Sequence, residues 1–263
     1  MVAALFLFGL FLPNWALAAA VSALSAIGCY ELLKAVEKAK NPVIYIFACL
    51  TAAAIPFSAW LGYEELEIRI CLIVLMSVLF LLSILNYQTE KEVPLSTVTA
   101  GLFGGIIIPV CFGAIVNLHN MQNGGLLVIM TFCITAVSDS GGYFAGILFG
   151  RHKGIVKASP NKTLEGFIGS FVCGILGTLL FGVIIDMLPD INVNYGVLAL
   201  LGTVGNALTQ LGDLAFSVVK RQNDIKDYGN IFPGHGGVLD RFDSVIFAAP
   251  AVMLIVRYLP VFI

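Results

Sequence analysis

The charged residues of this chain concentrate in one segment near its C-terminal end. Ser217 to Asp243 reads SVVKRQNDIKDYGNIFPGHGGVLDRFD and holds four basic residues, four aspartates and one histidine in 27 positions, whereas charged residues make up 11% of the whole chain. Its four glycines let the backbone approach a ligand closely. Cations, backbone N–H groups and metal-binding carboxylates are together what a polyanion requires. The segment therefore predicts a site for a phosphate-bearing ligand and a divalent cation.

Carboxylates flank this segment where apolar spans end and begin. On a helix, Asp213, Ser217 and Lys220 share one face, because they lie at positions i, i+4 and i+7. Asp240 and Asp243 lie three residues apart at the start of the next span. Carboxylates that converge from two helix ends suit magnesium, which completes its shell with water and phosphate oxygens. Salt bridges alone would explain some of these charges, but they would not explain the PGHGG sequence between them.

A second charged stretch, Gly150 to Gly166, reads GRHKGIVKASPNKTLEG. Its lysines Lys153, Lys157 and Lys162 precede the next apolar span, so a cationic loop leads into a helix N-terminus, where free N–H groups and the helix dipole favour anions. A plain cationic loop that binds anionic lipid headgroups is the alternative, and the spacing of a Walker A loop is absent. The other residues that we expect to bind a phosphate ligand here are Ser159, Asn161, Thr163 and Glu165.

One aspartate lies deep in an apolar stretch. Asp139 occurs in the sequence AVSDSGG, between Ser138 and Ser140. Because an ionisable group in hydrocarbon needs a partner to offset its desolvation, such a residue is a functional candidate by default. A structural aspartate that joins two helices by hydrogen bonds is the alternative.

The composition indicates an all-α polytopic membrane protein. Hydrophobic residues make up 59% of the chain, and the mean hydropathy is +0.97, whereas soluble domains are about 45–50% apolar. A spanning helix needs about 20 apolar residues. The sequence accommodates about nine such spans: 1 to 13, 15 to 33, 43 to 61, 69 to 86, 97 to 117, 124 to 149, 166 to 187, 196 to 219 and 243 to 262. A cleaved signal peptide is the competing interpretation of the first span, but no Lys or Arg precedes Lys34.

The distribution of Lys and Arg predicts the orientation, since short cytoplasmic loops collect them. With nine spans that start inside, 12 of the 14 basic residues lie in inner loops, and Arg69 and Arg257 lie outside. Both long polar loops, 150–166 and 220–242, then face the cytoplasm, and we expect a polar cavity open to that side. The most natural location is the cytoplasmic membrane of a bacterium. The net charge of -2 gives no reason to expect nucleic-acid binding.

Polar residues divide the chain into two regions. Spans 1 to 5 carry almost no ionisable side chain at mid-membrane depth, whereas spans 6 and 8 carry Asp139 and Asp213. We therefore predict that residues 1–123 form transmembrane helices that pack, anchor or support a homodimer. We predict that residues 124–263 form the catalytic region.

The whole segment Ser217 to Asp243 resembles, without a gap, the signature of the phosphatidate cytidylyltransferases, or CDP-diacylglycerol synthases. The matching positions are Ser217, Lys220, Arg221, Lys226, Asp227, Gly229, Phe232, Pro233, His235, Gly236, Gly237, Asp240, Arg241 and Asp243. The SDSGGYFAG, FGRHK and SPNKTLEG stretches are also similar to the family, so the likeness covers Ser138 to Asp243. The N-terminal 130 residues or so agree only in hydropathy. Members usually carry basic residues before the first span, and this chain departs from that pattern.

The resemblance implies that CTP and phosphatidic acid react, with magnesium, to give CDP-diacylglycerol and pyrophosphate at the bilayer surface. It implies that Asp213 and Asp240 hold the metal, and it leaves a second cation open. The catalytic candidates that it adds are Lys220, Arg221, Lys226, His235, Arg241 and Asp243, of which His235 has either a catalytic or a structural role. The expected substrate-binding residues are Asp139, Ser159, Asn161, Lys162, Thr163, Glu165, Gly236 and Gly237.

Two other classes of protein remain as alternatives. A CTP-dependent lipid kinase of the polyprenol or phytol type would use the same nucleotide, metal and kind of acceptor. A transporter would also place aspartates inside the membrane, but duplicated halves with broken helices are not visible here.

Overall fold

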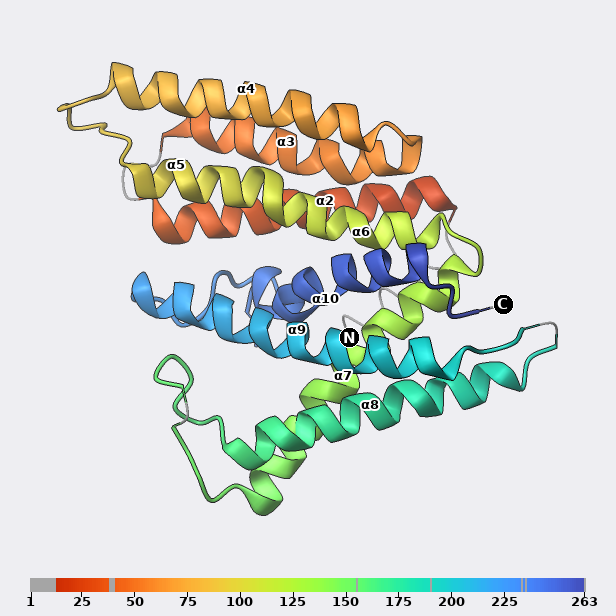
Figure 1. The fold of residues 1–263 in the computed structure, drawn as a ribbon. Coiled ribbons are helices and arrows are strands. Elements are labelled where there is room, and N and C mark those ends of the chain that lie inside the picture. Colours follow the sequence, from red (N-terminus) through yellow and green to blue (C-terminus); the bar gives the residue numbers. More distant parts are fainter. Residues whose placement is uncertain are drawn as a thin grey trace. The chain divides into compact units, whose positions relative to one another are not determined.

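The computed structural model describes residues 13–37, 41–154, 156–189, 191–232, 234 and 236–262. This part of the chain is helical, and its extended contacts are three isolated β-bridges. The helices are α2 (Asn14–Val36), α3 (Pro42–Leu61), α4 (Glu64–Leu85), α5 (Leu95–Leu102), α6 (Ile108–His119), α7 (Gly124–Phe149), α8 (Leu164–Asp186), α9 (Tyr195–Gln222) and α10 (Leu239–Tyr258), with a π-helical turn η1 (Phe103–Ile107) between α5 and α6 (Figure 1).

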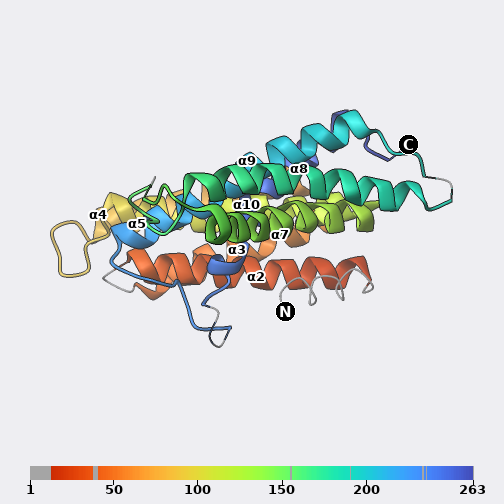
Figure 2. The same cartoon turned by 90° about the horizontal axis from the view of Figure 1, so that it is seen from below.

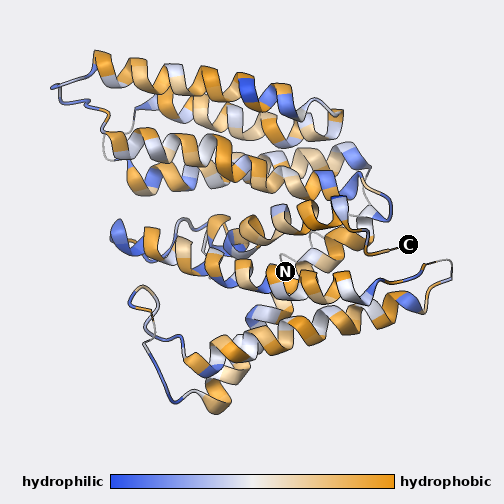
Figure 3. Cartoon of the chain, viewed as in Figure 1, coloured by the Kyte–Doolittle hydropathy of each residue, from blue (hydrophilic) through white to orange (hydrophobic). Residues whose placement is uncertain are grey.

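Within the described residues, seven helical segments are long and apolar enough to cross a membrane. They are α2, α3, α4, the continuous run from α5 to α6, α7, α8 and α9, and they coincide with predicted spans 2 to 8. Figure 3 shows apolar residues along these helices and hydrophilic residues in the connecting loops. Helix α10 covers the ninth predicted span, but Asp240, Arg241 and Asp243 make its start polar. The first predicted span lies outside the described residues. The polytopic helical class is thus confirmed, and nine is an approximate count.

The chain divides into two compact units. The first comprises residues 1–120 and 222–242, and the second comprises residues 121–221 and 243–263. The division at residue 120 is close to the predicted limit at residue 123. However, the charged segment 222–242 belongs with the N-terminal helices, although it follows the second region in sequence. The roles that we assigned to the two regions stay predictions.

Apolar side chains and glycines hold the first unit together. Its core includes Leu33 from α2, Ile44 from α3 and Leu75 from α4, all without exposed surface. In η1, a Cβ on Gly105 would lie 3.3 Å from the Cα of Ala48, so the backbones of η1 and α3 come into close contact. Small residues allow such approach between helices in a membrane.

In the second unit, α7 and α8 form the most extensive helix pair, and Figures 1 and 2 both show them side by side. A Cβ on Gly141 of α7 would overlap Cys173 of α8, and one on Gly169 would overlap Ala145. Helix α9 joins them through Asn206, which occupies the space above Gly174. Glycines therefore set the close spacing on which the site in this unit depends.

Candidate active site

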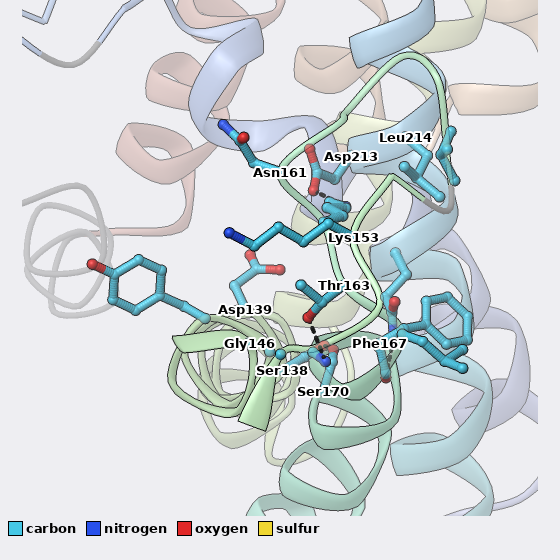
Figure 4. A pocket seen from close by; sticks show the side chains of 18 of the residues that line it. Ser138, Asp139, Gly146, Lys153, Asn161, Thr163, Phe167, Ser170, Asp213 and Leu214 are labelled. Carbon is cyan, nitrogen blue, oxygen red and sulfur yellow. Dashed lines mark hydrogen bonds and ion pairs between the residues drawn. The ribbon is translucent and has the colours of Figure 1, made fainter. Parts of the chain in front are cut away.

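A cavity of about 850 Å³ lies in the second unit, between α7, α8, α9 and the loop that precedes α8. One part of its wall is apolar, with Tyr143, Ile147, Phe167 and Leu214. The polar part carries the groups that could bind an anion or a cation, and these are Asp139, Lys153, Asn161, Lys162, Thr163 and Asp213. Figure 4 shows the Asp139, Lys153 and Asp213 side chains directed into the same space. The cavity therefore offers one surface to apolar chains and another to charged groups.

Backbone hydrogen bonds fold the loop before α8 against that helix. A β-bridge joins Lys153 to Thr163, and Gly154, at φ +76°, donates its N–H to the carbonyl of Lys162 at 3.2 Å. Thr163 is the N-cap of α8, because its hydroxyl accepts the N–H of Gly166 at 3.0 Å. These contacts hold Lys153 and Lys162 on opposite arms of the loop, both at the cavity wall.

Two residues of the loop that we expected to bind substrate instead contact the loop itself. The Glu165 carboxylate lies 2.6 Å from Nδ1 of His152. Ser159 accepts the N–H of Lys162 at 3.1 Å through its carbonyl and donates its own N–H to Val156 at 3.1 Å. Neither of the two lines the cavity. Asn161, Lys162 and Thr163 do line it, and their role in binding phosphate stays a prediction.

Lys162 reaches across the cavity to helix α9. Its ammonium group forms an ion pair with the Asp213 carboxylate, and 32% of each side chain is exposed. Ser217, one turn further along α9, donates its hydroxyl to Asp213 at 3.5 Å. A partly exposed ion pair of this kind is weak, so a ligand with a higher charge can replace one partner and bind the other.

Three carboxylates of the second unit lie in one another's electrostatic field. Asp139 and Asp243 each repel Asp213, and Lys162 and Lys220 act as counter-charges. The hydroxyl of Ser244 lies 3.4 Å from Asp139 Oδ2 and 3.4 Å from Asp243 Oδ1. Asp139 also lines the cavity, and whether it contacts substrate or only joins helices stays a prediction.

A buried hydrogen-bond network lies beside the cavity. Asn206, with no exposed surface, accepts the hydroxyl of Ser138 at 3.1 Å and donates to the carbonyl of Ser170 at 2.5 Å. Gln210 donates to Asn206 Oδ1 at 3.1 Å and to the carbonyl of Phe167 at 3.3 Å. Sequence reasoning missed Ser170, Asn206 and Gln210. The available signal was the occurrence of three polar residues within otherwise apolar spans.

In the first unit, Asp240 organises the charged segment. Its Oδ2 accepts the N–H groups of Tyr228 at 2.8 Å and Gly237 at 3.0 Å. Gly236 has φ +82°, a conformation that favours glycine, and its carbonyl accepts the N–H of Phe232 at 3.0 Å. Gly236 and Gly237 therefore shape the turn that approaches Asp240.

The remaining predicted residues occupy several places. Arg221, at the end of α9, donates its Nε to the carbonyl of Ala158 at 3.4 Å. Lys226 and Arg241 are exposed residues of the first unit. His235 lies outside the described residues. Asp213 belongs to the second unit and Asp240 to the first, so their shared role as metal ligands stays a prediction.

Magnesium at this site stays a prediction, and Asp213 is the cavity carboxylate available for it. Among the described residues, no group of three or more His, Cys, Asp or Glu side chains has the arrangement of a metal site. Magnesium in phosphate-transfer sites, however, uses one or two carboxylates and takes its other ligands from water and phosphate. Asp213 lines the cavity with a partly exposed carboxylate, which is the kind of ligand that such an ion requires.

These features define a polytopic membrane enzyme whose cavity combines an apolar wall with cations, carboxylates and a capped helix start. The sequence model of the Cytidylyltransferase family matches residues 1–259, and the chain belongs to this family. The resemblance seen in the charged motifs is thereby confirmed.

Individual relatives agree with the family match. The chain is 37% identical to a phosphatidate cytidylyltransferase of Bacillus subtilis (strain 168) over 190 residues. These aligned residues make up 72% of this chain and 67% of the relative. It is 40% identical over 169 residues to one from Mycobacterium bovis, covering 63% of this chain and 53% of the relative. For one from Staphylococcus epidermidis (strain ATCC 12228 / FDA PCI 1200), the identity is 44% over 123 residues, or 47% of this chain and 46% of the relative. The chain thus spans about half to two thirds of the length of these relatives.

Proposed function

We propose that the protein is a phosphatidate cytidylyltransferase. A phosphate oxygen of phosphatidic acid attacks the α-phosphorus of CTP, the bond to the β-phosphate oxygen breaks, and CDP-diacylglycerol and pyrophosphate form. The observation that carries the proposal is the cavity with Lys153, Lys162 and Asp213 on a polar wall beside Tyr143 and Phe167 on an apolar one. Both substrates are anions, and one has acyl chains, so a site for both needs these two surfaces.

Lys153 and Lys162 supply positive charge for the phosphates. Nucleotidyl transfer depends mainly on bringing two anions together and stabilising the charge on the leaving pyrophosphate. The capped start of α8 adds N–H groups with a partial positive charge beside Thr163. Because Lys162 forms an ion pair with Asp213, a bound triphosphate would compete with Asp213 for the same ammonium group.

Magnesium remains part of the proposal, with Asp213 and Asp240 as its protein ligands. When bound, the ion neutralises phosphate charge and polarises the phosphorus that is attacked. Asp139 and Asp243 add to the negative field at Asp213, which strengthens the attraction for a cation. The other predicted catalytic residues, Lys220, Arg221, Lys226 and Arg241, are proposed to bind phosphate oxygens.

The orientation is also a proposal. The excess of Lys and Arg in the loops on one side of the spans supports a site that faces the cytoplasm, where CTP is present. We propose the cytoplasmic membrane of a bacterium as the location, and a homodimer through residues 1–123 stays a prediction.

The position of a radioactive label tests the reaction. Purified protein in detergent receives magnesium, phosphatidic acid and CTP labelled at either the α- or the γ-phosphate. We expect label in the lipid only from α-labelled CTP, together with release of pyrophosphate. Transfer of the γ-label to a polyprenol would instead identify a lipid kinase. No lipid product alongside an active control enzyme would refute the proposal.

A further inference from the structure

One carboxylate of helix α2 holds the charged segment 222–242 in the first unit. Glu31 is 2% exposed, and its Oε1 and Oε2 accept the backbone N–H groups of Val238 and Leu239, each at 3.0 Å. Leu239 is the first residue of α10, where N–H groups lack partners within the helix and carry partial positive charge. Glu31 therefore caps the start of a helix that is distant in sequence, since 207 residues separate Glu31 from Val238.

Glycines of the segment make room for this carboxylate. A Cβ on Gly229 or on Gly237 would overlap Glu31 Oε1. Neither glycine has a positive φ, so their backbone conformations do not require glycine, whereas the close approach of Glu31 does. Gly28, one turn before Glu31, gives similar room to Leu239, whose Cδ2 would lie 3.1 Å from a Cβ at that position.

The same backbone stretch also carries the bonds that hold Asp240. Gly237 donates its N–H to Asp240 Oδ2 at 3.0 Å, and the next two N–H groups along the chain go to Glu31. Asp240 follows directly after Leu239 in α10. A shift of the helix start away from Glu31 would therefore move Asp240 with it.

We infer that Glu31 is a positioning residue, which fixes the start of α10 and thereby the placement of Asp240. The catalytic consequence of this inference rests on the proposed function, in which Asp240 binds the metal. The contact itself does not rest on it. Glu31 and Asp240 are close enough to repel each other, so the N–H groups between them are needed to hold both carboxylates in place.

The first test replaces Glu31 by glutamine. Glu31→Gln keeps the shape of the side chain but turns one acceptor oxygen into an NH₂ group, which offers no lone pair to a backbone N–H. Glu37→Gln is the matched control, because Glu37 follows the same helix and is also buried, but it accepts the N–H of Asn41 at 2.8 Å. Amide hydrogen exchange is followed by mass spectrometry, and the magnesium concentration for half-maximal turnover is measured alongside it.

In Glu31→Gln, we expect faster exchange in peptides covering residues 236–242 and unchanged exchange in α3. The magnesium requirement should rise about tenfold, and kcat/KM should fall on the order of tenfold to a hundredfold, as misplacement of a reacting group typically causes. The KM for phosphatidic acid should stay the same. Glu37→Gln should change none of these. Unaltered exchange and an unaltered magnesium requirement in Glu31→Gln would overturn the inference.

Gly229→Ala keeps the Glu31 side chain and therefore tests the inference even where the Glu31 variants do not fold, and unaltered exchange in this variant would contradict it. Gly229→Ala should accelerate the same exchange, since its methyl group displaces the carboxylate, and adding it to Glu31→Ala should cause little further change. Equal effects of Gly229→Ala with and without Glu31 would contradict the inference. If the unaltered protein forms no lipid product, the proposed function fails, and the exchange data still decide whether Glu31 holds the segment.

Discussion

The helices of the two units pack through different chemistry, which is clearest when α2, α3 and α4 of the first unit are compared with α7, α8 and α9 of the second. In the first, α2, α3 and α4 meet through apolar side chains such as Leu33 and Leu75. In the second, α7, α8 and α9 meet through hydrogen bonds centred on the buried Asn206. Apolar packing in a membrane needs only complementary shape, whereas a polar network also fixes the direction of each donor and acceptor.

This difference has a functional meaning. Ser138, Ser170 and Gln210 belong to the network and also line the cavity, so the groups that hold the helices lie beside those that we propose for binding substrate. The second unit thus contains structural polar residues and proposed functional ones within a few helical turns. Substitution of a structural residue should lower stability, whereas substitution of a functional residue should lower turnover.

The largest effect is expected from the functional carboxylates. Asp213→Asn and Asp240→Asn should each lower kcat by about 10²–10³ or more, because loss of one electrostatic contact has that effect and a metal ligand can contribute more. Thermal stability should change little for Asp213→Asn, since its side chain is partly exposed. Turnover is measured at ordinary magnesium concentration.

Asp186 at the far end of α8 provides the control for that prediction. Its carboxylate accepts the hydroxyl of Tyr195 at 3.2 Å and does not line the cavity, so Asp186→Asn should retain turnover. Near-normal turnover in both Asp213→Asn and Asp240→Asn would show that the metal assignment is wrong.

The second largest effect concerns the structural network. Asn206→Ala should destabilise the protein by roughly 1–3 kcal/mol, because it removes a hydrogen-bond partner from the buried polar groups of Ser138, Ser170 and Gln210. Thermal unfolding in detergent measures this. Thr203→Ala on the same helix is the control, since Thr203 is exposed and its hydroxyl donates to the carbonyl of Ala199 in the preceding turn of α9. Equal stability of the two variants would remove the distinction between the units.

A smaller effect is expected within the loop before α8. Lys162→Ala should raise the KM for CTP about tenfold, the effect of losing roughly 1.4 kcal/mol of binding, and should alter the KM for phosphatidic acid less. Lys157 is exposed and does not line the cavity, so Lys157→Ala should have a weaker effect on CTP. Steady-state kinetics with each substrate varied in turn provides the measurement. Equal effects on both substrates would point to a general role in folding or headgroup contact.

The smallest perturbation tests whether Asp139 faces water. In a background without native cysteines, Asp139→Cys should react with a small water-soluble thiol reagent added from the cytoplasmic side, because Asp139 lines the cavity. CTP with magnesium should slow the labelling. An unlabelled, destabilised variant would instead assign Asp139 to helix packing.

Much of the fold follows from hydropathy, because each span carries its own signal. The predicted span 124–149 has the limits of α7, and other predicted limits differ by a few residues where polar caps extend a helix, as at Thr163. Asp139, Lys162 and Asp213 were all predicted as site residues, and they meet in one cavity. Their charge in apolar surroundings was a sufficient local signal.

The contacts between distant segments were not predictable in this way. Nothing near Glu31 in the sequence indicates that its partners are Val238 and Leu239, and nothing near residue 222 indicates that segment 222–242 joins the first unit. The polar side chains of Asn206 and Ser170 were visible in their apolar spans, but their hydrogen-bond partners were not. A hydrogen-bond partner from another helix is set by three-dimensional packing, on which local hydropathy carries no information.

The long sequence separation of the Glu31 contact has a consequence for biosynthesis. Glu31 leaves the ribosome 207 residues before Val238, so at about 5–20 residues per second its partners are made roughly 10–40 s later. During this interval, helix α2 carries a carboxylate whose N–H donors do not yet exist. Burial of that carboxylate in hydrocarbon would be costly, which favours a shallow position of this end of α2, near the membrane surface, until the C-terminal segment is complete.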